Sequence, residues 1–96
     1  MITLLASRAL ASDPSIERGK ELFNSKLLGT NERSCATCHQ DGRGLEKAAT
    51  YDEAVLKDIV NQCIKRSLDG KAIDPASSDM KSLILYIRSF ASTGKH

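Results

Sequence analysis

The sequence of 96 residues contains no tryptophan and only two tyrosines and two phenylalanines. So few aromatic side chains are a thin set for a core that must hold a domain together by itself. A chain of this length is expected to form one domain with a modest core, and small domains often depend on a covalent or metal staple. The composition therefore favours a fold that closes around something besides its own side chains.

Long apolar runs, a dominant charge and strand-like alternation are also missing. No segment approaches the ~18–20 apolar residues that span a membrane. The formal net charge is +2, with acidic and basic residues interleaved. A nucleic-acid-binding protein would instead concentrate basic residues in a patch or stripe, so we expect no nucleic-acid partner. Without a convincing strand pattern, the expected fold class is all-α.

The first twelve residues differ from the rest of the chain. Residues 1–6 form a short apolar run, and Ala9-Leu10-Ala11 matches the A-x-A pattern of a secretory cleavage site. The basic segment usual in such signals is missing. We interpret residues 1–12 as a signal-peptide remnant or a disordered N-terminus, followed by a domain over residues 13–96. Cleavage after Ala11 would accompany export to the periplasm.

Apolar residues at helical spacing predict three main helices, over residues 16–23, 52–68 and 78–90. Segments 24–34, 40–50 and 71–76 are expected to be loops. Gly19 inside the first helix costs about 1 kcal/mol relative to Ala, so we expect another helix, through Tyr86, to approach it closely. The expected caps are Asp13 or Ser15 for the first helix and Ser77 or Ser78 for the last, with Gly70 ending the second.

The most specific pattern in the chain is Cys35-Ala36-Thr37-Cys38-His39, a C-x-x-C-H motif that is typical of covalent c-type haem attachment. Two thiols spaced in this way can each bond one vinyl group of the porphyrin, and the histidine that follows can ligate the iron. A zinc site would need two more ligands, for which only Cys63 and His96 remain. A thioredoxin-like pair would need neighbouring strands. We therefore predict one covalent haem c, held by Cys35, Cys38 and His39.

The second axial ligand of the iron has four candidates, namely Cys63, Met80, Asn61 and an open position. Cys63 has no intramolecular disulfide partner once the other two cysteines bind haem, and it shares an apolar helix face with Val55 and Ile59. A metal would deprotonate such a thiol, but a buried inert thiol fits the pattern equally well. Met80 has the helical spacing of a core residue, which favours packing over ligation.

Several segments carry a resemblance to known families. Residues 16–23, the motif at 35–39 and the helix at 83–90 resemble a class I monohaem cytochrome c over residues 15–91. Residues 60–72, 78–81 and 86–87 are similar to the haem domains of periplasmic thiosulfate dehydrogenases and of the SoxA subunit of sulfur-oxidising complexes. The resemblance implies that Cys63 ligates the iron and leaves Asn61 as a minor candidate. This chain has one haem motif where thiosulfate dehydrogenases have two.

The expected function is transfer of single electrons between periplasmic redox proteins, by a carrier rather than an enzyme. One alternative is an enzyme, or its haem subunit, that oxidises thiosulfate or another sulfur compound. Another is a sensor that binds a diatomic gas. Arg66 is a candidate contact to the cofactor, beside a bound sulfur or a propionate, and Lys71 is considered with it. Both residues also suit an ordinary solvated helix end.

Overall fold

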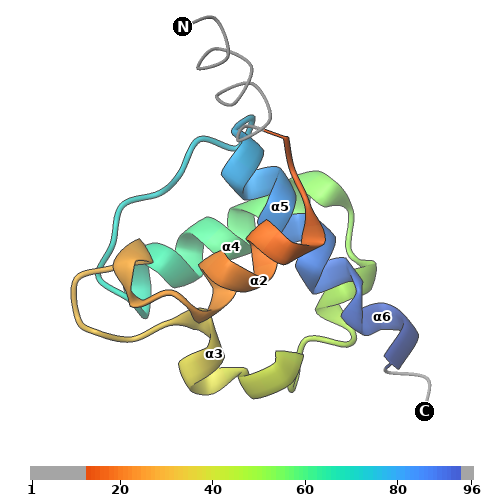
Figure 1. The fold of residues 1–96 in the computed structure, drawn as a ribbon, viewed down its shortest axis with the longest axis horizontal. Helices are drawn as coiled ribbons and strands as arrows, with labels where there is room; N and C mark the ends of the chain where they lie inside the picture. Colours follow the sequence, from red (N-terminus) through yellow and green to blue (C-terminus); the bar gives the residue numbers. More distant parts are fainter. Residues whose placement is uncertain (1–12, 94–96) are drawn as a thin grey trace, which may run out of the picture.

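The computed structural model describes residues 13–93, and this part of the chain contains helices and no strand (Figure 1). The all-α prediction is therefore confirmed for the described residues, while the proposed signal remnant, residues 1–12, lies outside them. No helix in residues 13–93 is both long and apolar enough to cross a membrane. The α-helices are α2 (Ile16–Asn24), α3 (Cys35–Cys38), α4 (Glu53–Arg66), α5 (Ser78–Arg88) and α6 (Phe90–Thr93), and the 3-10 turns are η1 (Lys26–Leu28), η2 (Gln40–Gly42) and η3 (Ala48–Thr50).

Helices α2 and α5 cross at Gly19, as the sequence predicts. A Cβ atom on Gly19 would lie 2.0 Å from the Ser82 carbonyl oxygen and 2.7 Å from Cβ of Tyr86. The backbone N–H of Ser15 donates a hydrogen bond of 3.0 Å to the Ser82 hydroxyl. Because only a hydrogen fits at residue 19, the backbones of the two helices can approach this closely.

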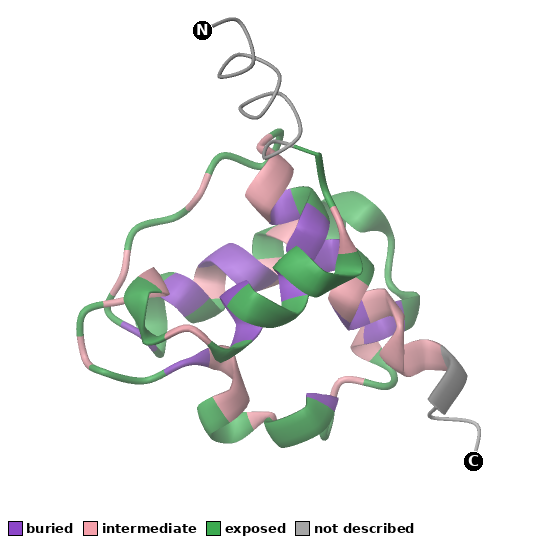
Figure 2. Cartoon of the chain, in the orientation of Figure 1, coloured by how far each residue is buried: buried purple, intermediate pink, exposed green. Residues whose placement is uncertain are grey.

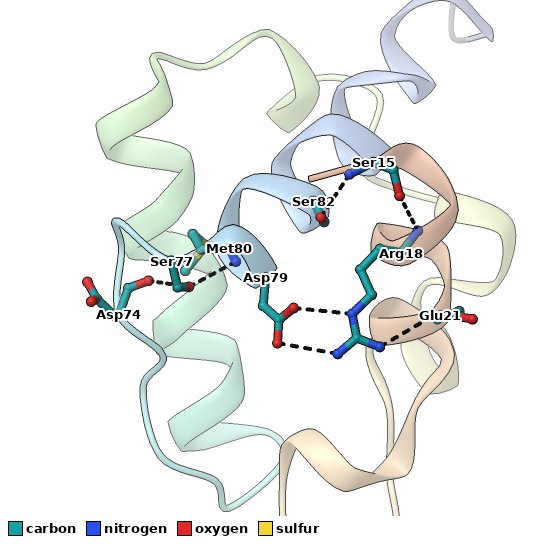
Figure 3. A network of polar contacts seen from close by, with 8 residues as sticks. All are labelled: Ser15, Arg18, Glu21, Asp74, Ser77, Asp79, Met80 and Ser82. Carbon is teal, nitrogen blue, oxygen red and sulfur yellow. Dashed lines mark hydrogen bonds and ion pairs between the residues drawn. The ribbon is translucent and has the colours of Figure 1, made fainter. Parts of the chain in front are cut away.

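Serine side chains cap both crossing helices at their N-termini (Figure 3). Ser15 accepts from the backbone N–H of Arg18 at 3.0 Å, and Ser77 accepts from that of Met80 at 3.1 Å. The Arg18 guanidinium also pairs with Asp79 at 3.2 Å across the crossing. Ser15 and Ser77 are therefore the caps, each one of two alternatives left open by the sequence.

The end of α4 differs from the prediction in its length and in the role of Gly70. The helix ends at Arg66, and the residue with left-handed backbone is Asp69, whose φ is 54°. Gly70 is required for a different reason, because its Cβ would lie 2.2 Å from the Leu28 carbonyl oxygen. Glycine is needed at this position because the backbone at Leu28 passes too close for a side chain, and not because the helix ends in a left-handed cap.

Hydrogen bonds connect the loop at residues 30–31 to the end of α4. The Thr30 backbone N–H donates to the Leu68 carbonyl at 2.9 Å, and its hydroxyl donates to the Asp69 carbonyl at 2.8 Å. The Asn31 side chain donates to the Ser67 carbonyl at 2.9 Å. These bonds tie the segment that leads into α3 to the helix that carries Cys63.

The core lies between α2, α4 and α5, where the buried positions of Figure 2 face one another. Phe23 of α2 makes edge-to-face contacts with Tyr86 and Phe90, at ring-centroid distances of 5.3 and 6.2 Å. All but one of the chain's phenylalanines and tyrosines are thus gathered in one cluster, away from most of α4. The buried apolar residues are Leu22, Phe23, Ala49, Leu56, Val60, Ile64, Leu68, Met80, Leu83, Ile84 and Ile87.

Candidate functional site

The candidate site is a pocket between α3 and α4, with residues of α2 and α5 at its base; we call it the thiol pocket. It encloses about 710 Å³ of empty space, its open mouth included. Most of the lining is apolar. The lining includes Phe23, Arg33, Cys35, Cys38, His39, Leu45, Leu56, Ile59, Cys63 and Leu83.

Both motif cysteines lie on α3, a helix of a single turn. The turn is fixed locally, because the Ser34 backbone N–H donates to the Thr37 hydroxyl at 2.9 Å and the Thr37 N–H donates to the Ser34 carbonyl at 3.0 Å. Burial raises the pKa of Cys35 to about 11, with a smaller effect from the negative charge of Cys63. The Cys35 thiol is therefore neutral at physiological pH, while Cys38 is exposed.

His39 is oriented by a backbone carbonyl from the segment that follows it. Its ring Nδ1 lies 2.8 Å from the Arg43 carbonyl oxygen. A carbonyl oxygen can only accept, so Nδ1 carries the proton in this contact. In the neutral ring Nε2 then keeps a free lone pair, the arrangement in which a histidine binds a metal.

Cys63 lines the same pocket from α4. Its neighbours on that face are Ile59 and Leu56, four and seven positions earlier in the helix. Burial raises the pKa of the Cys63 thiol, and the negative charge of Cys38 raises it further. The four residues predicted as haem and iron ligands from the motif and the cysteine count, Cys35, Cys38, His39 and Cys63, are thus brought together.

Most of the apolar stripe predicted for α4 is not buried: of Ala54, Val55, Ile59, Cys63 and Ile64, only Ile64 is. Val55, expected on the buried face, is 48% exposed, whereas Leu56, Val60 and Ile64 form the buried row. Both rows are apolar at helical spacing, so periodicity alone does not choose between them. Cys63 consequently lies at the edge of the buried row, where its side chain is exposed at the pocket rim.

The other ligand candidates lie elsewhere. Met80 is fully buried in the core and does not line the thiol pocket, in agreement with the packing role expected of it. Asn61 uses both ends of its amide on the extended loop, donating to the Ile73 carbonyl and accepting from the Ile73 N–H, both at 2.9 Å. Its side chain therefore holds residues 71–76 against α4.

The cationic residue at the thiol pocket is Arg33, and not the predicted Arg66. Arg66 is exposed in the last turn of α4 and Lys71 is exposed beyond it; neither lines the pocket. Within residues 13–93, the guanidinium of Arg33 has no hydrogen-bonding or ion-pair partner. Sequence reasoning missed Arg33, although its place two residues before Cys35 was a usable signal.

No cluster of three or more Cys, His, Asp or Glu side chains within residues 13–93 is arranged to hold a metal ion by itself. His96, considered as a zinc ligand, lies outside the described residues. In comparisons with protein-family models, curated proteins and solved structures, nothing matches this chain.

Proposed function

We propose that the chain is a c-type cytochrome of class I, which binds one haem through thioether bonds to Cys35 and Cys38 and through His39 as an axial ligand. The observation that carries the proposal is the contact between His39 Nδ1 and the Arg43 carbonyl at 2.8 Å. It fixes the tautomer that presents Nε2 to a metal, directly after a C-x-x-C pair that lines the same pocket.

The residues of the thiol pocket fit such a cofactor. The apolar side chains of Phe23, Leu56, Ile59 and Leu83 suit the porphyrin faces, and the open mouth leaves room for an edge with charged propionates. Arg33 supplies a cation, otherwise unpartnered among the described residues, for one of these carboxylates. A covalent cofactor in this pocket also accounts for a core with so few aromatic residues.

Cys63 is the proposed second axial ligand. It lines the same pocket as Cys35 and Cys38, from α4 where they line it from α3. Burial keeps the free thiol protonated, so Cys63 would have to lose its proton in order to bind the metal. Full burial of Met80 outside the pocket supports Cys63 over Met80.

The proposed activity is transfer of single electrons between periplasmic redox proteins. A bound haem supplies reversible one-electron chemistry, and the chain tunes it. The apolar lining would lower the polarity around the cofactor, the Arg43 carbonyl holds the Nδ1 proton of His39, and Arg33 contributes a positive charge. We infer a carrier rather than an enzyme, because with His39 and Cys63 as ligands both axial positions are filled.

A role in the oxidation of sulfur compounds is the second candidate. The observation that favours it is the exposure of Cys63 at the pocket rim, where its sulfur can be reached from solvent. Turnover of thiosulfate with an artificial electron acceptor distinguishes this activity from simple electron transfer.

The covalent cofactor is tested by mass spectrometry of the mature protein after acid–acetone extraction. We expect the mass to include one haem, because thioether bonds survive this treatment. Cys35→Ala together with Cys38→Ala is the matched control, and should release the haem. Extraction of all haem from the unchanged protein, or the presence of zinc instead, would overturn the proposal.

A further inference from the structure

The segment after His39 wraps tightly around the imidazole. Asp41, Gly42 and Gly44 all have left-handed backbone, with φ of 54°, 77° and 86°. The Gly42 N–H donates to the His39 carbonyl at 2.9 Å, and the Arg43 N–H donates to that of Gln40 at 3.0 Å. These turns aim the Arg43 carbonyl back at Nδ1 of His39. We call residues 41–45 the histidine strap.

The strap also passes beside the ring that it orients. A Cβ atom added at Gly44 would lie 3.6 Å from Nδ1 and 3.9 Å from Cε1 of His39. The Leu45 N–H donates to the Gly42 carbonyl at 2.9 Å, which closes the next turn, and Leu45 lines the thiol pocket. The strap therefore connects the imidazole to the pocket wall.

A single side chain from the C-terminal end of the described chain supports the strap from outside. Gly42 is buried, and a Cβ atom there would lie 2.4 Å from two ring atoms of Phe90. The Phe90 ring is itself held edge-to-face by Tyr86, at a centroid distance of 4.9 Å, and by Phe23. The ring therefore lies directly on the strap backbone, one residue before the carbonyl that accepts from His39.

We propose that Phe90 is a positioning residue for His39: its ring, packed on Gly42, holds the Arg43 carbonyl at Nδ1. The effect on iron chemistry rests on the proposed function, in which Nε2 is the ligand. A carbonyl that accepts the Nδ1 proton makes Nε2 a stronger donor, which favours oxidised iron. Without that support the hydrogen bond weakens and the reduction potential of the protein rises.

The test uses the full chain in its haem-loaded, reduced form. Nuclear magnetic resonance should show a slowly exchanging Nδ1 proton on His39 and a nuclear Overhauser effect between the Phe90 ring and the Gly42 α-protons. In Phe90→Leu we expect that proton to exchange about tenfold faster, the factor that corresponds to about 1.4 kcal/mol, and the potential to shift upward. Phe90→Tyr keeps an aromatic ring and should restore both values.

The matched control is Tyr86→Leu, which removes a ring from the same cluster but leaves Phe90 on Gly42. It should lower stability and change the Nδ1 exchange rate and the potential less than Phe90→Leu does, because Phe90 and not Tyr86 contacts Gly42. An unchanged exchange rate and potential in Phe90→Leu, or equal changes in the two leucine variants, would overturn the proposal. Should the variants not fold, the Phe90–Gly42 Overhauser effect in the unchanged protein decides, and its absence contradicts the inference.

A chain found to carry no haem would refute the proposed function but not this inference. The ¹⁵N shift of His39 Nδ1 then reports directly whether that nitrogen holds the proton. A deprotonated Nδ1, or no Overhauser effect between Phe90 and Gly42, would refute the positioning role as well.

Discussion

At the scale of single residues, the thiol pocket holds three cysteines whose surroundings differ. Cys35 is partly buried and its pKa is raised to about 11 by that burial, whereas Cys38 and Cys63 are exposed at the rim. The pKa of Cys63 is also raised, first by burial and then by the charge of Cys38. A neutral thiol such as that of Cys35 in an apolar wall suits either packing or attachment to a cofactor, and a bound metal would be needed to turn Cys63 into a thiolate.

The identity of the second axial ligand can be tested by substituting each of its two sulfur-containing candidates in turn. Cys63→Ser should move the spectrum of the oxidised protein toward high-spin or water-bound haem and raise its reduction potential, because a thiolate favours ferric iron. Met80→Leu should leave the spectrum nearly unchanged, since it is a volume-conserving core substitution that typically costs under about 1.5 kcal/mol. Absorption and electron paramagnetic resonance spectra measure both.

The opposite pattern would reassign the ligand. If Met80→Leu alone abolishes the low-spin signal, Met80 binds the iron and the protein is an ordinary His/Met electron carrier. The weak near-infrared band typical of Met ligation, which we expect to be missing from the unchanged protein, would then be present.

Arg33 and Arg66 form a matched pair for testing the charge at the pocket. Arg33→Gln should lower the reduction potential, because a cation beside the cofactor disfavours the additional positive charge of oxidised iron. Arg66→Gln removes the same charge from an exposed position outside the pocket and should have little effect. Voltammetry at low ionic strength measures both, and a larger shift for Arg66→Gln would contradict the assignment of Arg33.

At the scale of elements, the α2–α5 crossing is the contact most clearly specified by the sequence. A glycine within an otherwise good helix is unfavourable unless its missing side chain is needed. At Gly19 the Ser82 carbonyl occupies the space that a side chain would need. The Ser15–Ser82 hydrogen bond of 3.0 Å fixes the same contact. The crossing in turn places Phe23 under the thiol pocket.

Gly19→Ala should therefore destabilise the fold although alanine favours helices. Relief of the glycine penalty contributes about 1 kcal/mol, but a Cβ atom 2.0 Å from a backbone oxygen forces the helices apart. We expect a net loss of about 1–3 kcal/mol in the free energy of unfolding. Lys20→Ala, at the exposed neighbouring position, should stay within about 0.5 kcal/mol.

Urea unfolding followed by far-ultraviolet circular dichroism compares the two variants. Equal stability of Gly19→Ala and Lys20→Ala would show that the helices adjust freely, and that the close crossing is not required.

The stripe of α4 shows where pattern reasoning reaches its limit. Residues 55, 59 and 63 form one apolar row and residues 56, 60 and 64 form another, one position apart. The fold buries the second row, which packs in the core with residues of α2 and α5, and leaves Val55 48% exposed. A rotation of one position is enough to bring Cys63 from the core to the pocket rim.

At the scale of the whole molecule, the thiol pocket joins parts of the chain that are distant in sequence. Residues 30–31 grip the end of α4, Asn61 holds the loop at Ile73, and Arg88 donates to the Ala49 carbonyl at 3.1 Å. Each contact fixes one irregular segment to one of the longer helices. Irregular segments within residues 13–93, including those that lead into the pocket, are thereby held against the longer helices.

Export of the molecule is a separate prediction, made from residues 1–12 alone. In protein from its native host we expect the mature chain to begin at Ser12, because the A-x-A pattern ends at Ala11. N-terminal sequencing of the periplasmic fraction measures this, and Ala11→Arg should block the cleavage. An intact Met1 on a cytoplasmic product would contradict both the cleavage and the periplasmic location.

The sequence by itself determined the helical class, two alternatives for each of the two caps, the close approach at Gly19 and the C-x-x-C-H motif with its proposed haem chemistry. These depend on local spacing and on side-chain size, which the chain states directly. The tertiary structure decided which α4 row is buried, that Arg33 and not Arg66 lies at the pocket, and that Phe90 supports the strap at His39. Such features depend on helix rotation and on contacts between segments far apart in the chain, and no local pattern encodes them.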